Sequence, residues 1–145
     1  MKIFLDANVF VAASGNESGG SHYLFRVARH DSSWQLLTSA YALEEARLNI
    51  LKKLPLAGEI FSALITAPEL TIVHPPSPLF AAQVRGIVPL KDEAILAAAL
   101  FAQADFLCTL DQRDFHTTQA KHFCQRYGLK IVKPQDLLRQ WRQWQ

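Results

Sequence analysis

The chain has 145 residues, which is enough to bury a sizeable core in one domain. Half of the residues are hydrophobic and 19% are charged, and this composition excludes an intrinsically disordered chain. No apolar stretch approaches the roughly 20 residues of a membrane-spanning helix, and the first residues lack the layout of a signal peptide. The two cysteines show no CxxC spacing and are too few for a disulfide framework. We therefore expect a single domain over residues 1–145, with no membrane partner, in the reducing cytoplasm.

Short apolar runs alternate with helical patterns along the chain. Strands are expected at 2–5, 35–38, 70–73, 106–109 and 130–132, and helices at 21–30, 39–53, 56–66, 78–85, 92–103, 116–126 and 134–143. The strands lack a clean alternation of polar and apolar residues, as is typical of parallel strands that are covered on both faces. This order predicts a three-layer α/β/α sandwich with a mostly parallel central sheet, whose ligand site lies beyond the carboxyl ends of the strands.

Charge is unevenly distributed along these elements. The net charge is +2, but residues 1–112 carry −3 and residues 113–145 carry +5. A basic C-terminal third is suited to a polyanion, and the candidates for contacts with backbone phosphates are Arg113, Lys121, Arg126 and Lys130. Solvated helix faces would give the same pattern, and charge alone favours that simpler interpretation.

Asp6 lies inside core sequence, between the apolar runs at 3–5 and 9–11. Burial of an unpaired carboxylate is costly, so a partner or a metal ion must compensate for it. Further carboxylates stand at comparable places: Asp111 follows the strand at 106–109, Asp92 begins the helix at 92–103, and Glu44 and Glu45 lie in the helix at 39–53. These carboxylates could therefore share one edge of the sheet.

Several ionised carboxylates at one edge need a counter-charge. Two of them 4 Å apart repel by about 4 kcal/mol at an effective dielectric constant of about 20. Either some stay protonated or a divalent cation binds them, and hard oxygen ligands suit Mg²⁺ or Mn²⁺. Taken singly, Asp92 could cap its helix, Asp111 and Asp114 could be turn residues, and Glu44 and Glu45 could lie on a solvated face. Taken together, the positions favour a shared site.

Four segments, in this order, resemble the PIN-domain nucleases: FLDANVFVAA, TSAYALEEARLNIL, LKDEAILAAALFAQADFLCTLDQRDF and GLKIVKPQDLL. They span almost the whole chain, and the third is the most specific because it joins a helix, a strand and an acidic turn without a gap. The resemblance implies a divalent-metal-dependent ribonuclease, commonly the VapC-type toxin of a toxin–antitoxin pair. The expected partners are RNA, a small antitoxin protein and a second copy of the chain.

The resemblance also implies which residues form the site. The acidic positions of the family match Asp6, Glu45, Asp92 and Asp111, with Asp6, Asp92 and Asp111 as direct or water-mediated metal ligands. Glu44 is the alternative to its neighbour Glu45, and Asp114 matches an acidic position that members use variably. Small polar positions next to the site match Asn8, Ser39 and Thr109. Bound metal ions would activate a water molecule and stabilise the leaving oxygen during phosphodiester hydrolysis.

Two further features are interpreted without a role in catalysis. The segment SGNESGGS at 14–21 nearly spells a phosphate-binding loop but lacks its lysine, so we expect a flexible loop beside the site. Trp141 and Trp144 lie on one face of the last expected helix, where they could stack on bases, although packing in the core or between subunits is the simpler interpretation.

Three hypotheses of function remain open at this point. The first is a metal-dependent endoribonuclease that acts as a toxin, and the second is a housekeeping RNA-processing nuclease without an antitoxin. The third is a non-catalytic RNA-binding module, against which the complete acidic set argues. A metal-dependent phosphatase is more distant, because Asn8 stands where its Asp-x-Asp motif needs a second aspartate.

Overall fold

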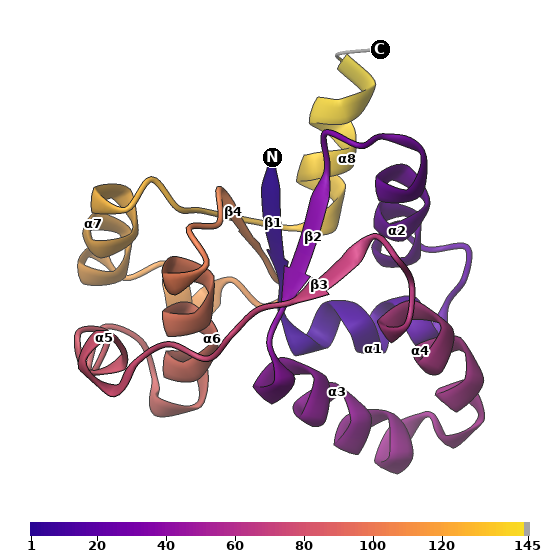
Figure 1. Cartoon of the computed structure of the whole chain (residues 1–145), viewed down its shortest axis with the longest axis horizontal. Helices are drawn as coiled ribbons and strands as arrows, with labels where there is room; N and C mark the ends of the chain where they lie inside the picture. Colours follow the sequence, from indigo (N-terminus) through magenta and orange to yellow (C-terminus); the bar gives the residue numbers. More distant parts are fainter. Residues whose placement is uncertain (144–145) are drawn as a thin grey trace.

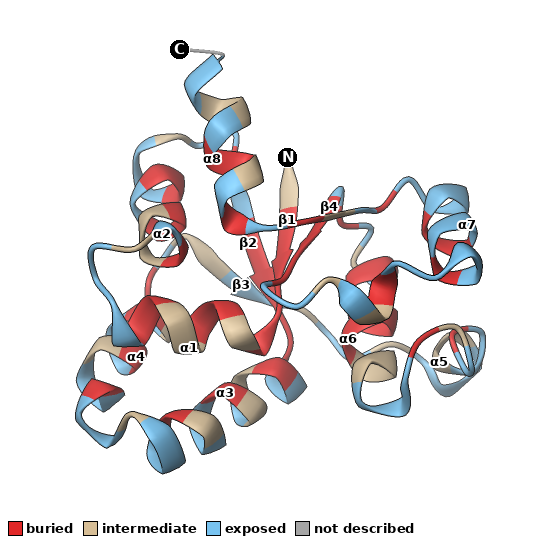
Figure 2. Ribbon diagram, turned by 180° about the vertical axis from the view of Figure 1, so that it is seen from behind, coloured by how far each residue is buried: buried red, intermediate tan, exposed pale blue. Residues whose placement is uncertain are grey.

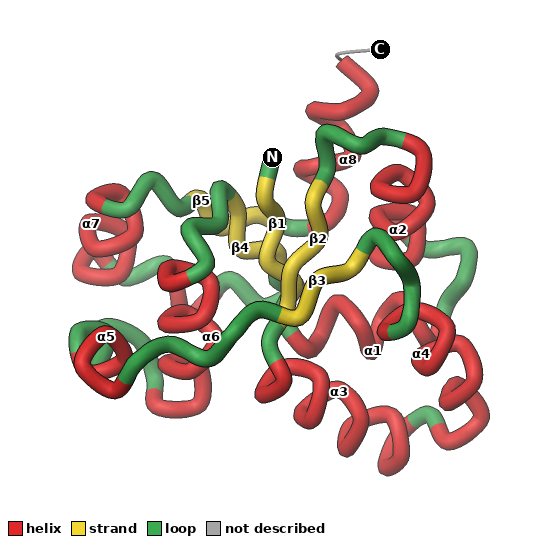
Figure 3. Tube along the Cα trace, viewed as in Figure 1, coloured by secondary structure: helices red, strands yellow, loops and turns green. Residues whose placement is uncertain are grey.

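The computed structural model describes residues 1–143 and contains a single parallel sheet. The strands are β1 (Lys2–Leu5), β2 (Gln35–Thr38), β3 (Leu70–Ile72), β4 (Phe106–Cys108) and β5 (Lys130–Val132), in the order β3-β2-β1-β4-β5 (Figures 1 and 3). The helices are α1 (Ala7–Gly15), α2 (Gly20–His30), α3 (Ala40–Lys53), α4 (Gly58–Ile65), α5 (Pro78–Ala82), α6 (Leu90–Phe101), α7 (Thr118–Arg126) and α8 (Pro134–Gln143), with short 3₁₀ helices η1 (Pro55–Ala57) and η2 (Arg113–Phe115).

Helices cover both faces of the sheet, so the predicted three-layer α/β/α sandwich is confirmed. Helices α1, α2, α4 and α8 lie on one side, α5, α6 and α7 lie on the other, and α3 runs past the end of the sheet (Figures 1 and 2). Ile3 and Leu5 of β1 pack into the core of the first side, whereas Phe4 packs into the core of the second. Because both faces of β1 are buried, its sequence is continuously apolar instead of alternating.

All five strands point the same way, so their carboxyl ends lie at one edge of the sheet. The first residues after β1, β2 and β4 are Asp6, Ser39 and Thr109. Backbone hydrogen bonds continue the ladder at this edge, from Asp6 N to Cys108 O at 3.0 Å and from Thr109 N to Val132 O at 2.9 Å. The sheet thus fixes the backbone of the residues that the sequence singled out.

Helix α1 is absent from the sequence prediction, which took residues 9–11 as a resumed apolar run. The helix is buried on several sides, through Ala7, Val9, Phe10, Ala13 and Ser14, so it has no polar face to reveal a helical period. The loop expected at 14–21 lies beside the site but is shorter than predicted, because α1 extends to Gly15 and α2 begins at Gly20, which leaves residues 16–19 outside the helices.

Most other boundaries agree within a few residues, with two informative differences. The helix expected at 92–103 begins at Leu90, so Asp92 lies inside its first turn instead of opening it. The pattern at 56–66 is divided between η1 and α4.

The C-terminal helix α8 packs within its own chain. Trp141 donates its indole N–H to Asp31 Oδ2 at 3.1 Å, and its ring meets that of Tyr23 edge-on at 6.3 Å between centroids. This favours packing over base stacking for Trp141, while Trp144 lies outside the described residues. Between residues 1 and 143, the helices are all too short or too polar to cross a lipid bilayer.

Candidate active site

Asp6 occupies the junction between β1 and α1 and is buried. It caps α1, because Oδ1 accepts a hydrogen bond from Ala7 N at 2.7 Å, and Oδ2 accepts one from Thr109 Oγ1 at 2.9 Å. Burial raises the pKa of this carboxyl, although both hydrogen bonds oppose the shift. Residues 1–143 supply no ion pair to Asp6. A cation partner within the described chain therefore does not explain this buried charge.

Thr109 and Asn8 form a small network around Asp6. The single hydroxyl proton of Thr109 goes to Asp6, while its oxygen accepts from Asn8 Nδ2 at 3.0 Å and from Asp111 N at 3.2 Å. Asn8 Oδ1 in turn accepts from Leu110 N at 3.1 Å. The network joins the end of β1 to the turn after β4, so Asn8 and Thr109 lie beside Asp6 and Asp111.

Glu44 and Glu45 are neighbours in α3, but their side chains lie in different surroundings. Glu44 is exposed and pairs with Arg47, with 2.6 Å between Oε1 and Nη2, and this hydrogen bond lowers the pKa of Glu44. Glu45 faces the same cavity as Asp6, and its pKa is raised by burial and then by the charge of Asp6. The geometry thus favours Glu45 over Glu44. Ser39 caps α3 by accepting from Ala42 N at 3.1 Å, and its side chain lines a neighbouring cavity instead of this one.

Helix α6 contributes Asp92 from its first turn. Atom Oδ2 of Asp92 is buried and has no hydrogen-bond partner among residues 1–143. Burial, together with the nearby carboxyls of Asp114 and Asp6, raises the pKa of Asp92 to about 7. Lys91 forms an ion pair with Asp114, with 3.2 Å between Nζ and Oδ2, and this pair lowers the pKa of Asp114. Asp114 therefore lies next to Asp92, but the ammonium group of Lys91 already compensates its negative charge.

These residues meet at one cavity of about 620 Å³ at the carboxyl edge of the sheet. Asp6, Glu45, Asp92 and Asp111 all line it. The sequence prediction missed two lysines and two asparagines that line the same cavity, Lys53, Lys91, Asn16 and Asn49. Of these, only Lys91 carried a usable signal, since it directly precedes Asp92.

Solved structures with the same arrangement of elements include two bacterial proteins. The VapBC2 structure from Rickettsia felis, described as bound to a DNA fragment from its promoter, matches at a TM-score of 0.66 and 16% identity, over 92% of this chain and 98% of that chain. VapC20 from Mycobacterium tuberculosis, described as a Sarcin-Ricin loop cleaving toxin, matches at a TM-score of 0.55 and 18% identity, over 77% of this chain and 91% of that chain. The fold is that of a PIN domain. No protein-family model and no curated protein matches the sequence.

Within this PIN fold, the donor set can be compared with the needs of a metal ion. In the part of the chain that the structure describes, the cavity offers carboxylate and amide oxygens as metal ligands, and Asp92 Oδ2 has no hydrogen-bond partner there. Nowhere in residues 1–143 do three or more His, Cys, Asp or Glu side chains stand close enough to ligate one ion together. Mg²⁺ keeps several of its waters and typically uses one or two carboxylates, so the residues suit a largely hydrated hard cation.

The cations predicted to contact RNA lie elsewhere in the PIN fold. None of Arg113, Lys121, Arg126 and Lys130 lines the acidic cavity. Arg126 ends α7 and Lys130 begins β5, so both lie toward the opposite, amino edge of the sheet. Arg113 lies in η2, near the turn that carries Asp111.

Proposed function

We propose that the chain is a divalent-metal-dependent endoribonuclease of the cytoplasm, which hydrolyses RNA phosphodiester bonds as the toxin of a toxin–antitoxin pair. The observation that carries the proposal is the cavity at the carboxyl edge, where Asp6, Glu45, Asp92 and Asp111 converge from separate parts of the chain. The likeness in fold to two proteins with VapC-type names supports the same assignment.

The proposed division of roles follows the surroundings of each side chain. Asp6, Asp92 and Asp111 would hold Mg²⁺ or Mn²⁺, directly or through water, and the bound ion would supply an activated water and charge stabilisation. Glu45, whose pKa is raised by burial, is suited to accept a proton from the attacking water. Lys53 and Lys91 line the cavity and are placed to contact the phosphate groups of the substrate.

The proposal is tested by RNA cleavage with Mg²⁺, with Mn²⁺ and with EDTA. Wild type should cleave single-stranded RNA only with metal, and Asp6→Asn and Asp92→Asn should lose the activity. Glu59→Gln is the matched control, because Glu59 is an exposed carboxylate on α4 outside the cavity. Full activity in EDTA, or in Asp92→Asn, would overturn the proposal.

An antitoxin partner is supported by a second surface that adjoins the acidic cavity. A small cavity of about 390 Å³ between the end of α1 and η1, which we call the Leu56 cavity, shares Gly15, Lys53 and Leu54 with it. Leu56 itself is 97% exposed. A short protein that covers Leu56 could also reach the carboxylates. Leu56→Glu should therefore weaken the complex with the product of a short neighbouring reading frame, and the absence of any such partner would favour a housekeeping RNA-processing nuclease.

A homodimer is a separate proposal. It is supported by Leu79 on α5, an apolar side chain that is 85% exposed. Sedimentation velocity of wild type and Leu79→Lys tests it, because disruption of an apolar subunit contact would convert a dimer to a monomer.

A further inference from the structure

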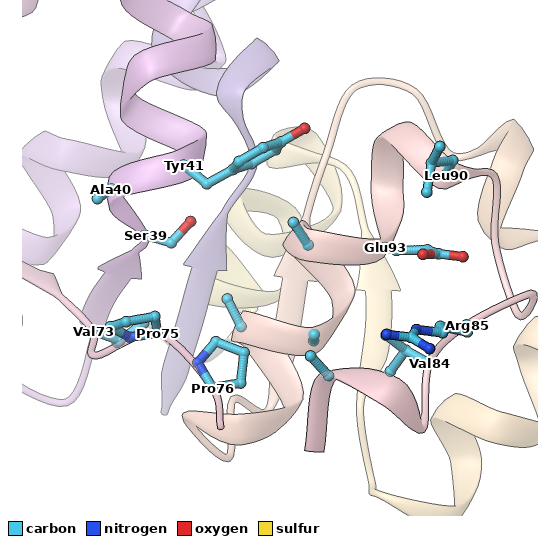
Figure 4. A pocket seen from close by; sticks show the side chains of 14 residues that line it. Ser39, Ala40, Tyr41, Val73, Pro75, Pro76, Val84, Arg85, Leu90 and Glu93 are labelled. Carbon is cyan, nitrogen blue, oxygen red and sulfur yellow. The ribbon is translucent and has the colours of Figure 1, made fainter. Parts of the chain in front are cut away.

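Another cavity, of about 380 Å³, lies beside the acidic one, and we call it the apolar cavity. Figure 4 shows the side chains that line it. It is bounded by the start of α3, the loop after β3, the segment from α5 to α6, and one face of α6. Its walls are mostly apolar and include Val73, Pro75, Pro76 and Val84, together with alanines of α6. This volume falls in the range of about 300–1,000 Å³ that is typical of small-molecule pockets.

The two cavities share the helices that form their walls. On α3, Tyr41 lines the apolar cavity, and Glu45, one turn later, lines the acidic cavity. On α6, Asp92 lines the acidic cavity and its neighbour Glu93 lines the apolar one. The pKa of Tyr41 is raised by burial and then by the carboxylates of Glu45 and Asp92, which is consistent with this proximity. A ligand that spans both cavities would therefore pass over Tyr41.

Few polar side chains line the apolar cavity, and one of them, Glu93, is held by a backbone hydrogen bond. Glu93 Oε1 accepts a hydrogen bond from Gly86 N at 3.0 Å, and Gly86 has a φ of +77°, which glycine adopts without strain. The Glu93 carboxylate is thus held in place while its second oxygen has no partner within residues 1–143. Figure 4 shows Arg85 beside Glu93, across the cavity from the ring of Tyr41.

This combination matches the chemistry of an unpaired nucleobase. Tyr41 is 46% exposed and offers an aromatic face for stacking, and the prolines and alanines offer flat apolar walls. A carboxylate accepts hydrogen bonds, so it selects a base edge that donates them. Guanine is the base whose Watson–Crick edge presents two adjacent N–H donors, one for each carboxylate oxygen. Arg85 is placed to pair with a phosphate that enters with the base.

We propose that this cavity binds a guanine base of single-stranded RNA that neighbours the phosphate in the acidic cavity. The proposal rests on the proposed ribonuclease function for its RNA source, whereas free guanine nucleotides share the same chemistry. A second copy of the chain is the competing occupant, and the test separates all three.

The first measurement follows amide chemical shifts of the protein in EDTA during titration with GMP, AMP, CMP or UMP. GMP should bind most tightly and shift Ser39, Tyr41 and Val84. Tyr41→Ala and Glu93→Gln should each weaken GMP binding by about tenfold or more. Tyr127→Ala and Glu59→Gln are the controls, because Tyr127 has a similar exposure of 43%, and neither residue lines the cavity.

The second measurement sequences the ends that wild type produces from a randomised RNA with Mg²⁺. Guanine should be enriched at one position next to the cut, and Glu93→Gln should lose this enrichment while it still cleaves. GMP binding without guanine enrichment would overturn the RNA assignment in favour of free nucleotides. Failure to bind any mononucleotide would overturn the proposal outright, even if RNA is cleaved. If Tyr41→Ala then also loses a dimer that wild type forms, the cavity is a contact between subunits. GMP binding without any RNA cleavage would count against the ribonuclease function and leave free nucleotides as the ligand.

Discussion

Thr109 donates its hydroxyl proton to Asp6 over a distance of 2.9 Å, and this bond joins residues 103 positions apart in the sequence. The same hydroxyl oxygen accepts from Asn8 Nδ2 and from Asp111 N. One buried side chain therefore connects the acidic end of β1 to the acidic turn after β4. It positions two of the carboxylates proposed to hold the metal, without itself being one of the acids.

Replacing Thr109 with Val keeps the shape of the side chain and removes these hydrogen bonds. The free energy of unfolding should fall by about 1–3 kcal/mol, because Asp6 loses a donor in a buried place. The affinity for Mg²⁺ or Mn²⁺, measured by calorimetry, should fall as well. Thr109→Ser keeps the hydroxyl and should retain most of the metal affinity. If Thr109→Val binds metal as wild type does, the network has no positioning role.

Two substitutions of Asp6 should separate the effect of its charge from its effect as a helix cap, in EDTA. Burial raises the pKa of the Asp6 carboxyl, which means that its ionised form destabilises the fold. Asp6→Asn removes this charge and keeps a good cap for α1, so the variant should melt at a higher temperature than wild type. Asp6→Ala loses the cap and should be less stable than Asp6→Asn by about 1 kcal/mol. Thermal melts measure both differences.

Thermal melts of wild type and Asp6→Asn with metal test whether Asp6 holds the ion. Mg²⁺ at a hundredfold excess over Kd should stabilise wild type by about 2.7 kcal/mol, and Asp6→Asn should lose most of this gain. An Asp6→Asn protein that is markedly less stable than wild type in EDTA would instead make Asp6 a structural residue.

Asp92 should make the stability of the metal-free protein depend on pH. Its pKa is about 7 in the folded chain, above its ordinary value of 3.8, so the ionised form destabilises the fold. This cost is absent below about pH 4, grows as the pH rises, and is complete above about pH 7. The stability of Asp92→Asn relative to wild type should therefore increase between pH 4 and pH 7, as measured by urea unfolding in EDTA.

Glu44→Gln is the control for this experiment, because its effect on stability should have the opposite sign to that of Asp92→Asn. The pKa of Glu44 is lowered by Arg47, so its ionised form favours the fold, and the substitution should cost a little stability at neutral pH and none in acid. A pH-independent difference between Asp92→Asn and wild type would mean that Asp92 ionises normally.

Lys53 should contribute to RNA binding more than its neighbour Lys52. Lys53 lines the acidic cavity, whereas Lys52 is exposed outside it. Loss of one phosphate contact reduces the slope of log affinity against log salt by about 1, so Lys53→Gln should show that change and Lys52→Gln should not. Lys121→Glu with Arg126→Glu tests the basic C-terminal third in the same assay. A larger change of slope in that double variant would place the RNA path over α7.

Local patterns in the sequence were enough to predict the alternation of strands and helices. The apolar runs at 2–5, 35–38 and 130–132 predicted β1, β2 and β5 with their observed bounds. The signal is continuous in β1 because that strand is buried on both faces, whereas β5 is an edge strand in which Lys130 is exposed and Val132 is buried. The same reasoning placed Asp6 and Asp111 at the carboxyl edge, since parallel strands bring all their carboxyl ends together. Helix α1 was not predicted, because a helix that is buried on several sides has no polar face and therefore no helical period in its sequence.

Tertiary structure alone decided which polar groups share a cavity. The sequence left Glu44 and Glu45 as alternatives, and the rotation of α3 against α1 turned Glu45 toward Asp6 and left Glu44 to Arg47. It gave no reason to single out Lys53, which comes to the acidic cavity only because α3 runs alongside α1, so that the end of α3 lies next to Gly15 at the end of α1. The sequence assigned Asp92 to the site but gave Glu93 no role, because neighbours on a helix point about 100° apart and only the packing of α6 brings Glu93 to a second cavity. Local patterns fix elements, whereas a shared cavity depends on how distant elements are oriented against one another.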